Sequence, residues 1–377
     1  MARKQQRGSV PVTEVVPDAP EFHSPQPDLG AQCLSDLARC FWAKSGDSGS
    51  WLSVVQHLMD AADVAGYLFD AYLSEHHRRL MASVWAGDHT KARTAFVFLA
   101  GIHDVGKVSP QFACQRQDLA QLIRHQGITV MRKTDYSERA FLPHGLVSQF
   151  AFQEENDAGG GVSSRALQWA ILVGVHHGRY PDASAVYVAR QQYRSQEGSR
   201  QDDPRWGQAR SEILRWMAQR SGFPLVAPGT ALPELPIAVA SAYASALVIV
   251  DWLASNEDYF PLRPRPIDGA ERLSIEGYPE LTADQQRERV ERGWKRAAFP
   301  SPLRLPAAST GEPEDFYRHR FGWPASYRPT DAQRAAIDIA THEDPDLMIV
   351  EAPPGSGKTE LAFAAAEVLM RARGLQG

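Results

Sequence analysis

Apolar residues recur at steps of three and four along the first 255 residues, which is the period of an α-helix. One such stripe lies in residues 51–73 and a second in residues 91–105, where Gly106 is expected to end the helix. Residues 166–177 and 236–255 are apolar on almost every side, which predicts buried helices. Strictly alternating patterns are scarce in this part of the chain. The pattern therefore predicts an all-α domain.

A polar segment separates the two buried helices. It is rich in Arg and Gln from Tyr187 to about Arg220, and it contains Trp206 and Trp216. We favour a solvated surface segment with one amphipathic helix. The alternative is a basic and aromatic surface that binds DNA or a partner.

The character of the sequence changes again near its C-terminus. A helical pattern follows Pro329, and residues 346–351 form a short apolar run that predicts a strand. A glycine-rich turn and a helix over 358–373 come next, and this strand–loop–helix order predicts the opening of an α/β domain. The whole chain is therefore divided as follows: a flexible tail over 1–30, a helical domain over 31–258, a linker over 259–326, and the start of an α/β domain over 327–377.

Composition adds three constraints. The 377 residues are 43% hydrophobic and 23% charged, which is ordinary for a soluble protein with a sizeable core. The formal net charge of −5 gives no overall basic surface, so binding of nucleic acid must depend on local sites. Three cysteines without metal-type spacing, no signal peptide and no stretch expected to span a membrane favour a cytoplasmic protein without a membrane partner.

Histidine and aspartate occupy unusual positions on the predicted apolar helices. A lone His on a core face is more often a hydrogen-bonded core residue than a ligand, and a buried Asp is costly unless it is paired or coordinated. Here the two residue types recur at five separate places, and imidazole and carboxylate are ligands of transition metals. We expect the following residues to converge on a metal: His57, His103, Asp104, His144, His176, His177 and Asp251.

The order of these residues resembles the HD superfamily of metal phosphohydrolases. The surrounding text is more specifically similar to the HD nuclease domain of the CRISPR-associated helicase–nuclease of type I interference. The matching stretches are QHLMDAADVA, LAGIHDVGKVSPQF, LPHGLVSQ, VGVHHGR and VIVDWLASN. The resemblance covers essentially residues 30–377. It implies a mainly α fold, with an all-α HD helical bundle followed by the beginning of an α/β RecA-like helicase domain.

The resemblance also implies a ligand set, because two metal ions share the site in that family. Such a pair can activate a water and stabilise the leaving oxygen of a phosphodiester. So many imidazoles favour manganese, iron, cobalt or nickel over magnesium alone. Lys107 is a candidate catalytic residue beside Asp104: it either contacts a phosphate or stabilises a helix end, and the sequence favours neither. One ion would be held by His57, His103, Asp104 and Asp251, and the other by Asp104, His144, His176 and His177.

The C-terminal segment contains a phosphate-binding loop, EAPPGSGKTE, between residues 351 and 360. Ala352 stands where the general pattern has Gly, a departure typical of the superfamily 2 helicases that this segment resembles. That resemblance implies ATP and magnesium in a full-length helicase, with Gln333 contacting adenine and Phe321 stacking on it. The phosphate contacts are expected from Gly355, Ser356, Gly357, Lys358 and Thr359. The sequence ends at Gly377 without a second acidic motif or motor lobe, so we expect no helicase or ATPase activity from it.

Three functions are compatible with these features. The leading hypothesis, implied by the resemblance, is an endo- or exonuclease that degrades single-stranded DNA and is recruited by an RNA-guided CRISPR surveillance complex, Cascade. The second is an HD phosphohydrolase of small nucleotides, which the helicase-like segment disfavours because a motor suits a polymer. The third is a catalytically silent module that binds the surveillance complex, which the complete histidine set disfavours.

Overall fold

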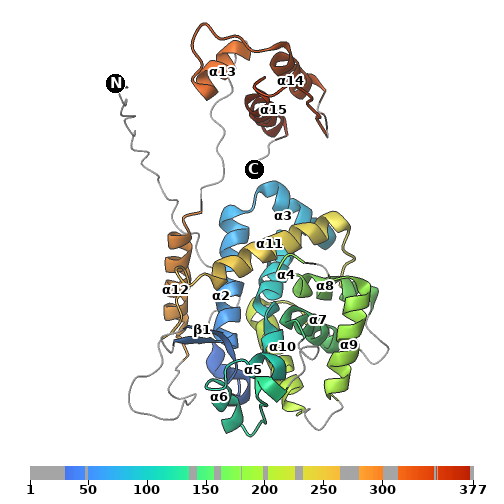
Figure 1. Ribbon diagram of the computed structural model, residues 1–377, viewed down its shortest axis with the longest axis vertical. Helices are drawn as coiled ribbons and strands as arrows, with labels where there is room; N and C mark the ends of the chain where they lie inside the picture. Colours follow the sequence, from blue (N-terminus) through green and yellow to red (C-terminus); the bar gives the residue numbers. More distant parts are fainter. Residues whose placement is uncertain are drawn as a thin grey trace.

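Helices form nearly all of the regular structure in the computed structural model (Figure 1). It describes residues 30–46, 50–135, 142–156, 163–179, 181–197, 203–225, 232–263, 280–299, 313–343, 345 and 347–373. The predicted tail over 1–30 lies almost wholly outside the described residues. The first part of the chain contains α1 (Asp36–Arg39), α2 (Val54–Tyr67), α3 (Glu75–Ala82), α4 (His89–Ile102), α5 (Pro110–Ala113), α6 (Ala120–His125), α7 (His144–Glu155), α8 (Ser164–Gly174), α9 (Ala183–Glu197), α10 (Arg205–Ser221) and α11 (Ile237–Ser255).

The centre of this helical domain is the pair α2 and α4, which α7, α8, α10 and α11 surround (Figure 1). Helix α2 begins at Ser53, whose hydroxyl accepts a hydrogen bond from the Gln56 amide, and all of its residues are buried. Helix α4 begins at Asp88, whose carboxylate accepts a bond from the Lys91 amide at 3.0 Å. These caps satisfy amides that the first helical turn leaves unpaired. The mainly α fold predicted from the apolar periodicity is confirmed.

The predicted helix over 51–73 is shorter than expected at both ends. Strand β2 (Trp51–Ser53) precedes α2 and pairs antiparallel with β1 (Trp42–Ser45). At the other end, a π-helical turn over Leu68–Tyr72 continues α2. The prediction was wrong over Trp51–Ser53 because these residues are buried in a hairpin, and a short apolar strand resembles a helical turn in sequence.

Part of the Arg- and Gln-rich segment lies in the core, and the two tryptophans considered for a basic aromatic surface are buried. Trp206 and Trp216 of α10 are 2% and 5% exposed. The buried Arg210 donates hydrogen bonds to the Val108 carbonyl and the Tyr193 hydroxyl, both at 3.0 Å. The preferred description as a solvated segment is also incomplete, since α10 is an amphipathic helix that packs against α4 and α7.

Replacement of Trp206 tests whether α10 is packed into the core. Its ring lies 5.3 Å from that of Phe41, inside the core. We expect Trp206→Ala to lower the free energy of unfolding by about 3–5 kcal/mol, because a large buried side chain leaves a cavity. Trp252→Ala is the control, since Trp252 is 70% exposed and a surface change is expected to cost about 0.5 kcal/mol or less. Denaturant unfolding curves measure both, and equal stability of the two variants would contradict the buried placement.

Two helices lie in the range expected to be a linker. Helix α12 (Ala283–Ala297) begins with a capping box at Thr282 and Gln285 and packs on α2. Helix α13 (Pro313–Phe321) follows later. The predicted linker over 259–326 therefore contains two helices, while the domain limits themselves stay a prediction.

The C-terminal helices pack on one another around a small apolar cluster. Helix α14 (Asp331–His342) contacts α15 (Lys358–Ala372) through Ala336, Ala340 and Leu361. The expected strand over 346–351 is not formed in its described part, 347–351. Leu347 and Ile349 are 76% and 78% exposed, and β1 and β2 are the strands of the described residues, so no neighbouring strand offers them a ladder.

Helix α11 is long and apolar enough to cross a membrane by length and composition, contrary to the sequence expectation. Half of its most hydrophobic window is nevertheless buried inside the structure. It also carries the buried Asp251 and packs on α2, α3 and α4. These contacts are those of a core helix.

Candidate metal centre

The seven predicted ligand residues come together in one place. His57 lies on α2, His103 and Asp104 at the end of α4, His144 at the start of α7, and Asp251 on α11. His176 and His177 lie in the turn after α8. Their ligand atoms form two groups, each with all its atoms within 4.8 Å of one another: His57, His103, Asp104 and Asp251 in the first, and Asp104, His144, His176 and His177 in the second.

Two of the histidines are oriented by backbone carbonyls. The Nδ1 atom of His103 lies 2.7 Å from the Ala100 carbonyl, and the Nδ1 atom of His176 lies 2.8 Å from the Val173 carbonyl. A carbonyl can only accept, so each Nδ1 must carry a proton and donate. In a neutral imidazole the Nε2 atom then carries a lone pair that faces the centre. Such carbonyl contacts are a common way to orient a metal-binding histidine.

Those lone pairs face other acceptors. The Nε2 atom of His103 lies 3.4 Å from oxygens of both Asp104 and Asp251. The Nε2 atom of His176 lies 3.3 Å from an Asp104 oxygen. Acceptors that face one another repel unless a proton or a metal cation lies between them. The geometry therefore requires a proton or a metal cation at this point.

Several polar atoms of the centre have no hydrogen-bond partner among the described residues. They are Nδ1 of His57, Nε2 of His103 and Oδ1 of Asp104, all in buried side chains. A buried polar atom without a partner is costly, and coordination of a metal is one way to remove that cost. Five imidazoles and two carboxylates also form the donor set that first-row transition ions prefer. The residues thus fit divalent metals.

One side of the centre is open. The side chains of His177 and His144 are 52% and 26% exposed, whereas His57 and His176 are fully buried. The Nε2 atom of His177 lies 2.9 Å from that of His144 and 3.1 Å from that of His176. A substrate can therefore reach the second group of ligands from the solvent without opening of the helical core.

Asp104 is the electrostatic focus of the site. Burial raises the pKa of Asp104, but the Lys107 ammonium and the neighbouring His103 and His144 together lower it by more. The net pKa therefore lies well below the usual range. Burial opposes protonation of His103, yet the adjacent carboxylates of Asp104 and Asp251 raise its pKa to about 9. Burial lowers the pKa of His57 to about 3. Asp104 is thus held as a carboxylate that both groups share.

Lys107 does not lie at an exposed helix end. It belongs to a 3-10 turn over Val105–Lys107, and its Nζ lies 2.6 Å from Oδ2 of Asp104. The side chain is buried and also lies over the Phe112 ring, with Nζ 5.4 Å from the centroid. Its contact with a phosphate stays a prediction.

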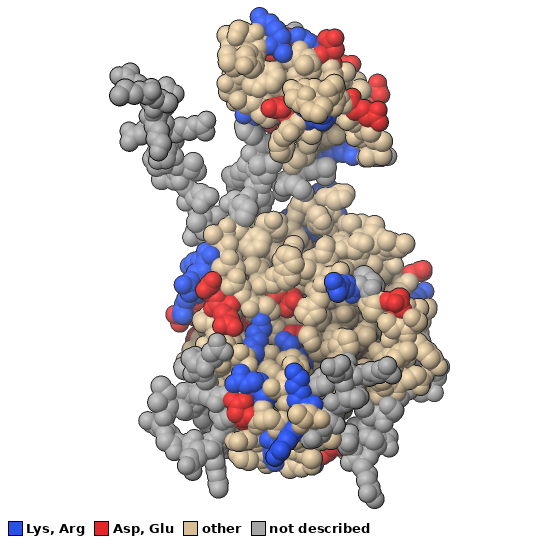
Figure 2. All heavy atoms as spheres, in the orientation of Figure 1, with Lys and Arg blue, Asp and Glu red and all other residues tan. Residues whose placement is uncertain are grey.

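A second lysine near the centre was missed by sequence reasoning. Lys44 lies on β1, and burial together with the Lys107 ammonium lowers its pKa to about 8, against the effect of Asp104 and Asp251. Because the hairpin itself was not predicted, no sequence signal placed Lys44 beside the helices. Figure 2 shows further Lys and Arg side chains gathered around α5 and α6, whereas the surface over α11 and α8 is largely uncharged.

Comparison with known proteins identifies the family of this chain. The sequence matches the family described as "Cas3, HD domain" over residues 42–260, which is more than half of its 377 residues. The chain belongs to the Cas3 HD family. Among its relatives is the CRISPR-associated nuclease/helicase Cas3 of Streptococcus thermophilus, 26% identical over 364 residues, or 89% of this chain and 35% of the relative. The CRISPR-associated endonuclease/helicase Cas3 of Thermus thermophilus is 27% identical over 355 residues, or 91% of this chain and 34% of the relative.

Solved structures give the same relationship. The crystal structure of a CRISPR-associated protein has 25% sequence identity to this chain and a TM-score of 0.61. The match covers 93% of this chain and 36% of that protein. The crystal structure of T. fusca Cas3 with ADP has 25% sequence identity to this chain and a TM-score of 0.55. That match covers 90% of this chain and 35% of the solved protein. The chain thus spans about a third of the length of these Cas3 proteins.

The nucleotide-loop residues are also close together. Gly355 and Gly357 have positive φ angles of 77° and 80°, which glycine adopts without strain and which turn the loop into α15. The buried Gln333 closes a capping box with Thr330, and its Nε2 donates to the Gly357 carbonyl at 3.1 Å. Lys358 donates to loop carbonyls at 2.6 and 2.9 Å.

The remaining predicted contacts of this segment are less clearly placed. The Thr359 side chain is exposed, and the Ser356 hydroxyl is buried without a hydrogen-bond partner among the described residues. Phe321 stacks on Tyr317 at 5.7 Å. Gln333 and Phe321 thus occupy structural contacts here, and their adenine contacts stay predictions.

Proposed function

We propose that this chain is a metal-dependent nuclease that cleaves phosphodiester bonds of single-stranded DNA in CRISPR type I defence. The observation that supports it most is the pair of His and Asp groups that share Asp104 at an open edge of a Cas3-family domain. In a cell it would act in the cytoplasm, on a strand presented by an RNA-guided surveillance complex.

Seven residues would hold two divalent cations, drawn from manganese, iron, cobalt, nickel or magnesium. When bound, such a pair supplies an activated water and charge stabilisation at a phosphodiester. Asp104 would belong to both ions, since its two oxygens face different histidines: Oδ2 lies 3.0 Å from Nε2 of His57, and Oδ1 lies 3.2 Å from Nε2 of His144.

Other groups of the protein would orient the histidines and attract the substrate. The Ala100 and Val173 carbonyls keep the donor nitrogens of His103 and His176 turned toward the site. Lys107 and Lys44 add positive charge beside it, which favours an approaching phosphate. The exposed side chains of His177 and His144 mark the side from which the strand would enter.

A polymer fits this chain better than a small nucleotide. The similarity to nuclease/helicase proteins extends over 89% of the chain and therefore reaches beyond the residues of the HD family match. Helices α13 to α15, with the phosphate-binding loop, would belong to a RecA-like helicase domain that binds ATP and magnesium in a full-length protein. A motor that moves along a strand is of use to a nuclease and of none to a nucleotide phosphatase.

The test is cleavage of circular single-stranded DNA with manganese, which requires endonucleolytic attack. We expect linear and then shorter products, complete loss of cleavage with excess chelator, and no hydrolysis of free nucleotides under the same conditions. Hydrolysis of nucleotides while the circle stays intact would favour the small-nucleotide alternative. Metal analysis that finds no ion above background would favour the silent binding module.

A further inference from the structure

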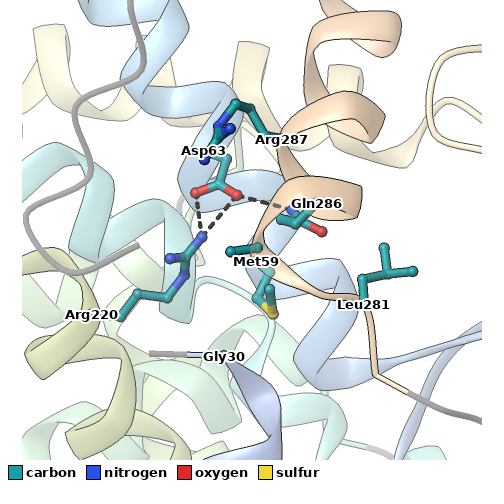
Figure 3. Close-up of a pocket in the computed structure, with 8 residues that line it drawn as sticks. Gly30, Met59, Asp63, Arg220, Leu281, Gln286 and Arg287 are labelled. Carbon is teal, nitrogen blue, oxygen red and sulfur yellow. Dashed lines mark hydrogen bonds and ion pairs between the residues drawn. The ribbon is translucent and has the colours of Figure 1, made fainter. Parts of the chain in front are cut away.

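Helix α12 docks on α2 through a buried polar network. Figure 3 shows one part of it, the Asp63 carboxylate with its contacts to Arg220 and Gln286. One Arg220 nitrogen donates to both oxygens of Asp63, at 2.6 and 2.8 Å. The Nε2 atom of Gln286, from α12, donates to an oxygen of the same carboxylate at 2.9 Å. Burial raises the pKa of Asp63, and the Arg220 charge opposes this.

One turn earlier on α2, Asp60 makes even more contacts with α12. The guanidinium of Arg289 binds both Asp60 oxygens, with Nε at 3.0 and 3.1 Å and a terminal nitrogen at 2.9 Å. Asp60 is fully buried, and the Arg289 side chain is 11% exposed. Such a bidentate ion pair fixes the relative orientation of the two side chains and also neutralises the buried charge.

The network reaches the residue that precedes a proposed metal ligand. The Nε2 atom of Gln56 donates to Asp60 at 3.0 Å and to Oε1 of Gln286 at 2.7 Å. Gln56 is adjacent to His57 in α2, and His57 in turn lies 3.0 Å from Asp104. The rotation and axial position of α2 set where the His57 ring lies, and the side chains of α12 hold α2 at both Gln56 and Asp60.

Apolar contacts also fix the position of α12 along α2. Val290 is 1% exposed, and a Cβ on Gly293 would lie 2.6 Å from the Phe260 ring, so only glycine permits this approach. Trp294 packs on Tyr67 of α2, with ring centroids 5.7 Å apart. Helix α12 lies beyond residue 260, where the HD family match ends. Helix α12 thus packs on the helical domain although the family match does not cover it.

We propose that Arg289 and Gln286 of α12 are positioning residues for His57, acting through Asp60 and Gln56 of α2. This inference rests on the proposed two-metal function, since it concerns the position of one ligand of the first group. Neither residue reaches the metal groups themselves. They act by fixing the helix that carries the ligand, as contacts around metal ligands commonly do.

Arg289 and Gln286 should affect the two ions differently. The first ligand group includes His57, while the second contains no residue of α2. Loss of the α12 contacts should therefore weaken one ion and leave the other unchanged. A general loss of stability would weaken both.

The experiment measures manganese binding to the whole chain by titration calorimetry. For Arg289→Ala we expect one of two binding events to weaken by about 10–100-fold and the other to stay as in the wild type. Arg289→Lys should recover only part of the lost affinity, because its ammonium can still pair with Asp60 but cannot reproduce the two-nitrogen contact of the guanidinium. The matched control is Arg292→Ala, on the same helix, whose side chain is 58% exposed and pairs with Glu288.

Circular dichroism and thermal melting establish that each variant is folded. If Arg289→Ala does not fold, Gln286→Leu removes only amide hydrogen bonds and should give the same selective loss. Unchanged binding of both ions, or equal weakening of both, overturns the proposal. A wild-type chain that binds two ions but leaves DNA intact rejects the proposed nuclease and still allows the positioning role to be measured. A wild-type chain that binds no manganese rejects both.

Discussion

Asp104→Asn is expected to abolish DNA cleavage, with a loss on the order of 10³-fold or more, because members of one catalytic unit are not additive and loss of one disables the rest. Asp104 is the residue that both ligand groups share. Asn has nearly the same shape but lacks the negative charge, and its NH₂ group cannot coordinate a metal. The rate of cleavage of single-stranded DNA and the metal content of the purified protein measure the two consequences.

The control for this change is Asp258→Asn, which removes an exposed carboxylate outside both groups. It should leave cleavage and metal content unchanged. His57→Asn and His144→Asn, each in one group only, should each weaken a single ion. Retention of two tightly bound ions by Asp104→Asn would contradict the shared position of this carboxylate.

The clustering of these His and Asp residues was largely predictable because most of them lie on, or directly after, helices that carry buried apolar residues. When Leu99 and Ile102 are buried, the position of His103 on the same helix is nearly fixed. Histidine and aspartate on a core face are conspicuous in sequence, since they are costly there without a partner. The sequence could not provide the distances between side chains on different helices. The convergence of Asp251 with His103, 148 positions earlier, depends on how α11 crosses α4.

The docking of α12 was not predictable by the same reasoning. Its sequence is dominated by charged and amide side chains, so the segment was assigned to a linker. Gln286 and Arg289 are nevertheless buried or nearly so, because Asp60 and Asp63 on α2 satisfy them. The apolar stripe of α12 is limited to a few residues such as Val290 and Trp294, and the partner carboxylates of the polar interface lie more than 220 residues away in sequence. Periodicity alone cannot detect it.

Two further features depended on tertiary packing, which local sequence patterns do not contain. Trp206 and Trp216 among arginines resembled an exposed aromatic surface, yet the rings are buried and the buried Arg210 is satisfied by a carbonyl and a hydroxyl. The apolar run over 347–351 has the composition of a strand but no neighbour to pair with among the described residues. A strand is defined by its partner, and the sequence of the strand itself does not contain that information.

Gly106 offers a sharper test of how the centre is assembled. It follows α4 as expected, but its importance lies in packing, because its φ is not positive. A Cβ placed on it would lie 2.0 Å from the His144 carbonyl oxygen and 2.5 Å from the Ser148 amide nitrogen. Its own amide donates to the Ser148 hydroxyl at 2.8 Å. Both neighbours are backbone or short side chain, so neither can move without a shift of α7.

We therefore expect Gly106→Ala to lower the free energy of unfolding by about 1–3 kcal/mol, as overpacking of a dense core does. The shift of α7 would also move His144, so binding of the ion in the second group should weaken selectively. This is the opposite selectivity from Arg289→Ala, which acts on the first group. The two variants thus address the two ions from opposite sides of Asp104.

Gly207→Ala is the matched control, since a Cβ there would meet only an Arg210 nitrogen at 3.8 Å, an ordinary contact. Within α10 this change should be neutral or stabilising by about 0.5–1 kcal/mol, because Ala loses less backbone entropy than Gly in a helix. Denaturant unfolding and manganese titration of both variants check the result. If Gly106→Ala is as stable as Gly207→Ala and keeps both ions, the turn after α4 is not held against α7 as closely as the structure indicates, and the second ligand group does not depend on that contact.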